Sequence, residues 1–446
     1  MESLAQFRHW FDSHRERIKQ DYFQFLRYRS VSADPAYKEE MHACAKWLKE
    51  YLSQGGFHAE TIPTPGYPLV YAEDLSAGGK TLLIYGHYDV QPVDPVELWK
   101  SDPFEPTERD GQVYARGAVD DKGQIFYAVL AAIATKQIRG KLPINLKFCI
   151  EGEEESSSVG LSKALDGLRK KLKADYLLVP DFDQFDRTTP AISLGCRGLV
   201  GLEVTLRGSK RDLHSGMYGG VAYNPNRALV ELLAQLWDEK GRVQVSGFYD
   251  EVVDAKAENF DASSASEEEG ILAFGGEKGR SLHETKCLRP TLELNGICGG
   301  YAGAGIKTVI PSQAMAKITC RLVPNQDPEK IGREIGAFLK KRATPGMEVT
   351  VQIHPGGARA FRSDPSSKLA RAISTAAEEV CGKPCKRLLC GGSIPIVPEL
   401  IAASGAEMVG MGYGLAGDEI HAPNEHFDMQ RLEKGFLTVA RGMELL

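Results

Sequence analysis

The chain has 446 residues, a formal net charge of −6 and a hydrophobic share of 42%. This length exceeds that of most single domains, so we expect two domains, each with its own core. Positive and negative charges are mixed along the chain without a basic cluster, which argues against nucleic acid as a partner. The longest apolar run, residues 125–134, is too short to span a bilayer, so no membrane partner is expected.

The nine cysteines are odd in number and scattered along the chain. This usage favours reduced thiols over a disulfide framework. Residues 1–20 have an amphipathic helical pattern and lack the uninterrupted apolar stretch of a secretory signal. We therefore expect a soluble, cytoplasmic protein.

In chain order, helical periodicity over residues 4–11 and 41–52 predicts two packing helices. Strand-like segments then alternate with helical patterns, which predicts a mostly parallel sheet flanked by helices, an α/β fold. The predicted strands of this part are residues 69–72, 81–85, 144–150, 176–179 and 191–194. The same alternation of helices and strands returns after residue 365, with helices predicted at 367–380, 395–403 and 429–446 and strands at 386–389 and 407–411.

Between these parts the order is strand, helix, strand, strand, helix, strand, which is the ferredoxin-like α+β pattern. Its predicted elements are residues 199–206, 226–237, 291–295, 315–322, 328–341 and 348–354. A polar, acidic segment, 247–280, interrupts them and is interpreted as a long loop, partly helical at most. We therefore divide the chain into residues 1–197, an inserted domain at 198–356, and residues 357–446.

Several chemically active side chains lie after predicted strands of the mostly parallel sheet. Gly86 is expected to turn the backbone so that His87 and Asp89 project from the end of strand 81–85. Asp120 directly precedes a predicted helix at 124–136, four acids lie within residues 151–155, and Asp181 follows strand 176–179. Taken singly, each has an ordinary reading as a turn residue, a helix start or a loop side chain.

Taken together, these residues form a ligand set. Two imidazoles and three carboxylates at strand ends of one sheet suit a pair of divalent ions, with zinc expected and manganese or cobalt as alternatives. The predicted ligands are His87, Asp120, Glu155, Asp181 and His421. Asp89 is placed to orient the ring of His87, and Glu154 is the candidate general base for a water between the ions.

The segments GHYDVQP, ARGAVDDKG, EGEEES, HSGMYGG, GIKTVIP, ITCRLVP and GGSIP, with the late His421, resemble metallopeptidase family 20. The resemblance is to its cytosolic nonspecific dipeptidase and carnosine dipeptidase branch, and it runs from about residue 38 to the C-terminus. It implies a zinc-peptidase-like catalytic domain, formed by residues 1–197 and 357–446, and a lid and dimerisation domain at 198–356. The family also contains aminoacylase, desuccinylases and carboxypeptidase G.

The resemblance also implies how the ligands are shared. Asp120 would bridge the two ions, and the Asp120-Asp121 peptide would be cis. His87 and Asp181 would hold one ion, and Glu155 and His421 the other. Asp183 is the rival to Asp181, which we prefer because its spacing to Arg197-Gly198 resembles that of the family.

Four further residues match family positions. His214 would reach the active site of the partner subunit and bind the oxyanion, so a homodimer is expected. Thr308 and Arg321 would grip the terminal carboxylate of the substrate, and Ser393 would contact it from a loop at a helix start. Read alone, His214 could cap a turn and Arg321 could be an ordinary surface arginine of a strand.

The expected activity is hydrolysis of dipeptides by a metal-bridging hydroxide, with Glu154 as general base. The alternative within the same family is an N-acyl amino acid deacylase, a desuccinylase or a carboxypeptidase, because one metal pair serves all of these reactions. A catalytically inactive binding module belongs to a different class. The complete ligand set and the retained Glu154 speak against it.

Overall fold

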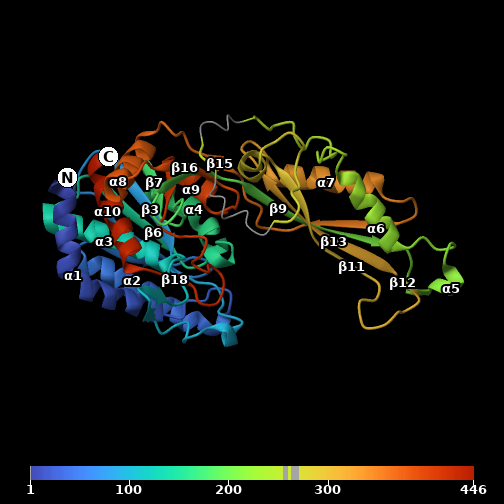
Figure 1. The fold of residues 1–446 in the computed structure, drawn as a ribbon, viewed down its shortest axis with the longest axis horizontal. Helices are drawn as coiled ribbons and strands as arrows, with labels where there is room; N and C mark the ends of the chain where they lie inside the picture. Colours follow the sequence, from blue (N-terminus) through green and yellow to red (C-terminus); the bar gives the residue numbers. More distant parts are fainter. Residues whose placement is uncertain (1, 255–259, 263–270) are drawn as a thin grey trace.

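The computed structural model describes residues 2–254, 260–262 and 271–446. The molecule is elongated and has two lobes (Figure 1). Both chain ends lie in the larger lobe, where the hydroxyl of Ser3 donates to the carboxylate of Glu444 at 2.5 Å. No helix in these ranges is both long enough and apolar enough to cross a bilayer.

The larger lobe contains a nine-stranded sheet. Its order is β1-β2-β6-β3-β7-β17-β8-β15, and β16 pairs with β8. The bounds are β1 His58–Ile62, β2 Leu69–Asp74, β3 Thr81–His87, β6 Asn145–Glu151, β7 Tyr176–Val179, β8 Ala191–Cys196, β15 Phe361–Arg362, β16 Lys386–Cys390 and β17 Glu407–Met411. The central strands β6, β3, β7 and β17 are mutually parallel, and the flanking β1, β2 and β15 pair antiparallel. The predicted α/β sheet is confirmed.

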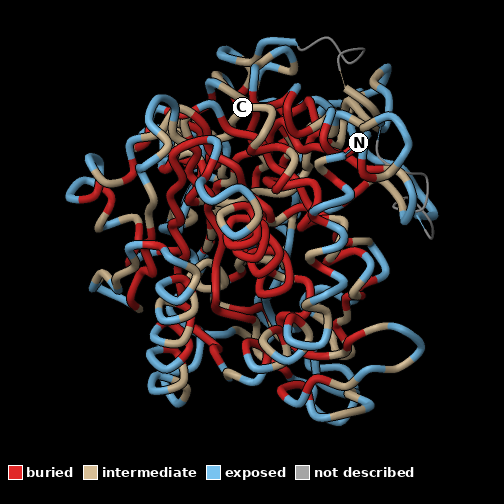
Figure 2. Tube along the Cα trace, turned by 90° about the vertical axis from the view of Figure 1, so that its left-hand side faces the viewer, coloured by how far each residue is buried: buried red, intermediate tan, exposed pale blue. Residues whose placement is uncertain are grey.

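Helices cover both faces of this sheet. One face carries α1 (Glu2–Arg27), α2 (Lys38–Gln54), α3 (Lys122–Arg139), α8 (Lys368–Cys381) and α10 (Met429–Leu445). The other face carries α4 (Val159–Leu172) and α9 (Val397–Ser404). Strands buried on both faces have continuous apolar runs, as in β6, where all seven residues are buried. Figure 2 shows the buried trace gathered inside the lobe and exposed turns around it.

The predicted turn at Gly86 is wrong. Strand β3 continues through His87, which pairs with Glu151 of β6. Gly86 instead provides space, because a Cβ atom there would lie 2.5 Å from Oδ2 of Asp121. The glycine therefore admits a buried carboxylate beside the strand rather than bending the backbone.

The smaller lobe contains a four-stranded antiparallel sheet in the order β11-β13-β9-β14. Its elements are β9 (Gly198–Arg207), α6 (Pro225–Leu233), β11 (Thr291–Gly299), β13 (Gln313–Leu322), α7 (Pro328–Arg342) and β14 (Glu348–Ile353). Burial alternates along β9, and its buried side chains form one core with α6 and α7. This is the predicted ferredoxin-like order, although α6 ends four residues before Trp237, the predicted end.

Several strands escaped prediction because most of them are only two or three residues long, too short to show a pattern. They are β4 (Thr107–Arg109), β5 (Gln112–Tyr114), β10 (Leu213–His214), β12 (Val309–Ile310) and β18 (His426–Phe427), besides β1 and β15. In the predicted loop 247–280, the described residues 247–254, 260–262 and 271–280 form neither helix nor strand. Its acidic stretch 264–270 lies outside the described residues.

Candidate metal centre

The carboxyl ends of the central parallel strands bring the predicted ligands together. This edge is where ligands bind in open α/β sheets. His87 ends β3, Glu155 lies in the 3₁₀ turn Glu154–Ser156 after β6, and Asp181 lies two residues after β7. Asp120 lies two residues before α3, and His421 lies in the connection from β17 to β18.

These five side chains form two triads that share Asp120. In the first, Nε2 of His87 lies 3.1 Å from Oδ1 of Asp120 and 3.8 Å from Oδ2 of Asp181. In the second, Nε2 of His421 lies 2.9 Å from Oδ2 of Asp120 and 3.3 Å from Oε1 of Glu155. Within each triad the possible donor atoms all lie within 4.8 Å of one another.

This donor set fits two divalent cations. Each triad offers one imidazole nitrogen and carboxylate oxygens, the ligands that zinc and similar ions take in proteins. Asp120 presents a different oxygen to each triad, which is how a bridging carboxylate holds two ions. The fit rests on these contacts and not on the resemblance.

The electrostatics of the triads also favour cations. Burial acts to raise the pKa of Asp120, but hydrogen bonds from His421 and His87 outweigh it and hold this pKa below its usual range. Hydrogen bonds to Asp120 and Glu155 in turn raise the pKa of His421 to about 10. Burial, with neighbouring carboxylates, raises the pKa of Asp181 well above its usual range. The carboxylates therefore repel one another unless positive charge lies between them.

Glu154 lies beside this cluster and is available for proton transfer. Burial, together with the nearby Glu155 and Asp120, raises the pKa of Glu154 to about 7, although His87 opposes the shift. A carboxyl group with a pKa near neutrality can both accept and release a proton. The predicted role of Glu154 as a base agrees with this environment.

Asp89 contacts more than the predicted partner. Nδ1 of His87 lies 3.0 Å from the carbonyl oxygen of Asp89 and 3.3 Å from its carboxylate. The carboxylate also accepts the backbone N–H groups of Glu154 at 3.2 Å and Glu155 at 3.1 Å. Asp89 thus fixes the ring of His87 and the turn that carries Glu154 and Glu155.

Glu425 is a functional candidate that our sequence reasoning missed. Its carboxylate is 1% exposed and accepts the backbone N–H groups of Gly117, Val119 and Asp120 at 2.8, 2.9 and 3.1 Å. It also pairs with Arg116 at 2.9 Å. Glu425 therefore holds the loop that presents Asp120. A signal existed, since Glu425 lies four residues after His421 in an otherwise turn-like segment.

Two more supporting residues were missed. The carboxylate of Asp121 accepts the backbone N–H of His87 at 3.0 Å, and Nε2 of Gln91 donates to Glu155 at 2.7 Å. Both lie in segments that carried the resemblance, but their partners are not visible in a sequence pattern. The Asp120-Asp121 peptide is cis, as the resemblance implies.

The structure separates Asp181 from its rival. Asp183 lies in neither triad and is instead packed against Gly414, where a Cβ atom would lie 2.2 Å from its Oδ1. Burial raises the pKa of Asp183 to about 6, and the negative charge of Asp418 adds to the shift. The geometry therefore favours Asp181 as the ligand.

Arg321 and Ser393 lie together where the two lobes meet. Arg321, on β13 of the smaller sheet, donates from Nη1 to the hydroxyl of Ser393 at 2.9 Å. Ser393 precedes α9 of the larger lobe and donates to the carbonyl of Arg197 at 2.5 Å. These contacts join the two lobes.

His214 and Thr308 also lie together, but far from the triads. His214 ends β10 and Thr308 directly precedes β12, and the N–H of Ser215 donates to the carbonyl of Thr308 at 3.0 Å. This pair and α5 (Ser215–Tyr218) form the far end of the smaller lobe (Figure 1). His214 is exposed, and its Nδ1 accepts the N–H of Gly216 at 3.0 Å, which is the turn-capping arrangement. One chain does not bring His214 to its own triads.

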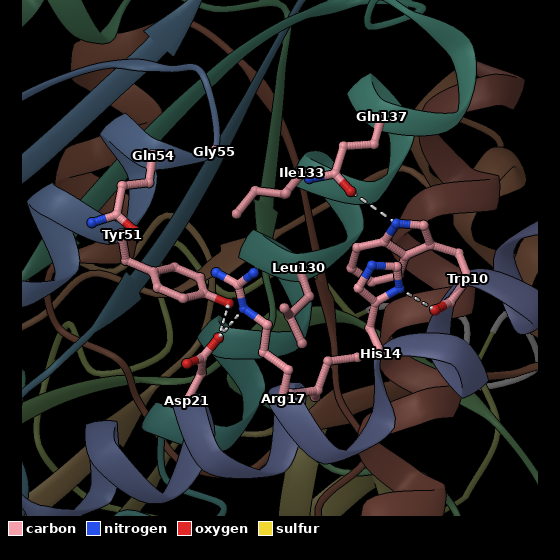
Figure 3. Close-up of a pocket in the computed structure, with 11 residues that line it drawn as sticks. Trp10, His14, Arg17, Asp21, Tyr51, Gln54, Gly55, Leu130, Ile133 and Gln137 are labelled. Atoms are coloured by element: carbon pink, nitrogen blue, oxygen red, sulfur yellow. Dashed lines mark hydrogen bonds and ion pairs between the residues drawn. The ribbon is translucent and has the colours of Figure 1, made fainter.

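A pocket of about 100 Å³ between α1, α2 and α3 is a separate feature (Figure 3). Its polar groups bind one another: Asp21 lies 3.2 Å from the hydroxyl of Tyr51 and 3.6 Å from Nε of Arg17. It borders the second half of α3, whereas Asp120 precedes the first turn of that helix. The pocket therefore belongs to the packing of the helices and not to the metal centre.

A mostly parallel sheet with two ligand triads for cations at one edge, joined by a shared carboxylate, defines a class, the dinuclear metal-dependent hydrolases. Within that class the chain belongs to peptidase family M20/M25/M40, whose family model matches residues 83–444. The resemblance found in the sequence is confirmed, and the chain is a metallopeptidase of this family.

Several characterised proteins are similar over most of their length. The Cys-Gly metallodipeptidase DUG1 of Candida albicans is 32% identical over 442 residues, which are 92% of this chain and 90% of that protein. The human Beta-Ala-His dipeptidase is 33% identical over 388 residues, 82% of this chain and 74% of that protein. The crystal structure of the M20 family metallo-carboxypeptidase Sso-CP2 from Sulfolobus solfataricus superposes with a TM-score of 0.84 at 32% identity, covering 96% of this chain and 98% of that one.

Proposed function

We propose that this protein is a dinuclear metallo-dipeptidase. The observation that carries the proposal is the carboxylate of Asp120, shared between two triads, with Glu154 half-buried beside them. Two similar proteins are named for the hydrolysis of Cys-Gly and of Beta-Ala-His, which are both dipeptides. Their similarity supports a small peptide substrate with free ends.

In this account the triads hold the ions and Glu154 moves the proton. Two divalent ions, when bound, would polarise the scissile carbonyl and lower the pKa of a water molecule to near neutrality. The Glu154 carboxylate takes the proton of the attacking water and then delivers it to the leaving amine. Asp89 keeps the turn that carries Glu154 in place through its bonds to two backbone N–H groups.

The substrate carboxylate is assigned to the contact between the lobes. A guanidinium group can bind a carboxylate through two parallel hydrogen bonds, and Arg321 is half-buried there with Ser393 beside it. In this assignment the substrate replaces the present contact between Arg321 and Ser393. Thr308 lies beside His214 at the far end of the smaller lobe. It is therefore assigned to bind the substrate carboxylate in the active site of the partner subunit.

We further propose a homodimer in which residues 198–356 act as a lid and interface. His214 is exposed and lies at the opposite end of the molecule from its own triads, so only a second copy could bring it to them. There it would donate a hydrogen bond to the oxyanion, a contact often worth about 3–4 kcal/mol. Exposed apolar side chains near it, Met217 and Val221, are 72% and 80% exposed and support a covered surface in this region.

A carboxypeptidase is the second candidate, because a structure with a TM-score of 0.84 to this chain carries that name. An N-acyl amino acid deacylase would use the same triads. The test is a panel of dipeptides, longer peptides and N-acetyl amino acids, each with the protein loaded with zinc, manganese or cobalt. The proposal requires that dipeptides have the highest kcat/KM, and turnover of longer peptides alone would replace it by the carboxypeptidase reading.

A further inference from the structure

Cys196 and Cys390 face each other across two neighbouring strands of the large sheet. Each is the last residue of its strand, β8 or β16, and their Cα atoms are partners in the parallel ladder. Neighbouring strands lie about 4.8 Å apart, within the range of about 4.4–6.8 Å that disulfide-bonded Cα atoms span. Both thiols are free in this structure.

The two sulfurs have different environments. Sγ of Cys390 accepts the backbone N–H of Gly392 at 3.3 Å. The Cys196 thiol donates to the same sulfur, and this hydrogen bond lowers the pKa of Cys390 to about 7 although burial opposes it. The same bond, with burial, raises the pKa of Cys196 well above its usual range. Cys390 is therefore the nucleophile of the pair and Cys196 the proton donor.

The accessibility of the two thiols also indicates that Cys390 is the more reactive one. Cys390 is partly exposed, whereas Cys196 is 5% exposed and buried behind it. A low-pKa, accessible thiol beside a second thiol is the arrangement of a redox-sensitive site with its resolving partner.

We propose that Cys390 and Cys196 form a reversible redox pair that adjusts the substrate loop Gly391–Ser393. The Cys390 thiolate attacks hydrogen peroxide, the O–O bond breaks, and a sulfenic acid forms while the released hydroxide takes up a proton to become water. The Cys196 sulfur then displaces the sulfenic oxygen, which leaves as a second water with the Cys196 proton. The two thiols lose two electrons and one peroxide becomes two waters.

The consequence follows from what the loop touches. Gly391 accepts from Nε of Arg197 at 2.9 Å, and Ser393 accepts from Arg321 at 2.9 Å. An S–S bond of about 2.05 Å draws the sulfurs closer than a hydrogen bond between them allows. The ends of β8 and β16 and the adjoining loop must move, and the contact of Gly392 with a thiolate is lost. This consequence, though not the disulfide itself, rests on the proposed function of Arg321 and Ser393.

The test exposes the reduced, full-length, metal-loaded protein to a small excess of hydrogen peroxide. Blocking of free thiols and peptide mass mapping should then find Cys196 joined to Cys390, with a loss of two hydrogens that dithiothreitol reverses. In Cys196→Ser, Cys390 should be trapped as a sulfenic acid that a dimedone probe labels. Cys298→Ser is the matched control, because Cys298 is exposed on β11 and away from the pair. Disulfides at other cysteines, or an unreacted Cys390, would overturn the proposal.

Two readouts separate the redox pair from the proposed activity. Hydrogen exchange at the backbone of residues 391–393 should change on oxidation and recover on reduction, whether or not a substrate is known. KM for a dipeptide should rise roughly ten-fold with little change in kcat, as expected for the loss of one hydrogen bond to a charged group. A disulfide with altered exchange in a protein without dipeptidase activity would support the pair and reject the proposed function. A disulfide with unchanged exchange and KM would reject the coupling to the loop.

Discussion

The carboxylate of Asp120 contacts the imidazole of His421 at 2.9 Å across 301 residues of sequence. Its other oxygen contacts His87 at 3.1 Å, so one side chain joins both triads. The loop that presents it is held by Glu425, which accepts three backbone N–H groups there. The centre is therefore built around the placement of a single carboxylate.

Removal of that carboxylate should abolish the paired site. In Asp120→Asn one of the two oxygens that join the triads becomes an amide nitrogen, so we expect at most one tightly bound ion per chain. Activity should fall by at least about a thousand-fold, within the range that loss of a general acid or base also produces. Metal analysis after gel filtration measures the first effect. Asp183→Asn is the control, since this carboxylate lies in neither triad. Equal metal loss in both variants would contradict the assignment.

Glu154→Gln should separate binding of the ions from catalysis. The amide keeps the size of the side chain but cannot accept the proton, so kcat should fall by about 10²–10⁴. The metal content and KM should stay close to those of the wild type, because Glu154 is in neither triad. An unchanged kcat would exclude Glu154 as the base.

We expect Glu425 to hold the loop that presents Asp120 and to take no direct part in the catalytic step. Glu425→Gln keeps an acceptor for the loop but removes its charge, and we expect metal affinity to fall about 10–100-fold, as for other residues that orient ligands. Excess metal should then restore most of kcat, which a catalytic residue would not allow. Glu425→Ala leaves Arg116 buried and unpaired, so it should cost about 3–5 kcal/mol of unfolding free energy. Denaturant titration measures this loss.

Glu151 should make the stability of the fold depend on pH. Burial raises the pKa of Glu151 to about 8, above that of an unfolded chain, and its Oε2 has no hydrogen-bond partner in the structure. Between the unfolded and folded pKa values the native state holds a proton that the unfolded state has released. Stability should therefore fall as pH rises from about 5 to 8, by up to about 1.4 kcal/mol per pH unit, and level off above.

The variant Glu151→Gln isolates this effect. It cannot ionise, so its unfolding free energy relative to the wild type should increase over the same pH range. Glu407→Gln, at an exposed position of β17, serves as the reference. Parallel pH profiles for the wild type and Glu151→Gln would show that Glu151 does not titrate in this range.

Most positions in the triads were predictable, because His87, Glu155 and Asp181 follow apolar strands and Asp120 precedes a helix. The proximity of His87, Glu155 and Asp181 follows from one rule: the carboxyl ends of parallel strands lie at the same edge of a sheet. The position of Glu425, four residues after His421, gave a signal, but the partners of Glu425 and Asp121 are backbone N–H groups that no residue pattern reveals. Gly86 was misread for a related reason: its role is to leave space for Asp121, a neighbour 35 residues later in the chain.

The central claim is that two ions held by a shared carboxylate hydrolyse a dipeptide. The most direct measurement is dipeptide hydrolysis by chelator-treated protein during stepwise addition of zinc or manganese. The account predicts almost no activity without metal and recovery that saturates near two ions per chain. Full activity in the chelator, or saturation at one ion with Asp120→Asn as active as the wild type, would contradict it.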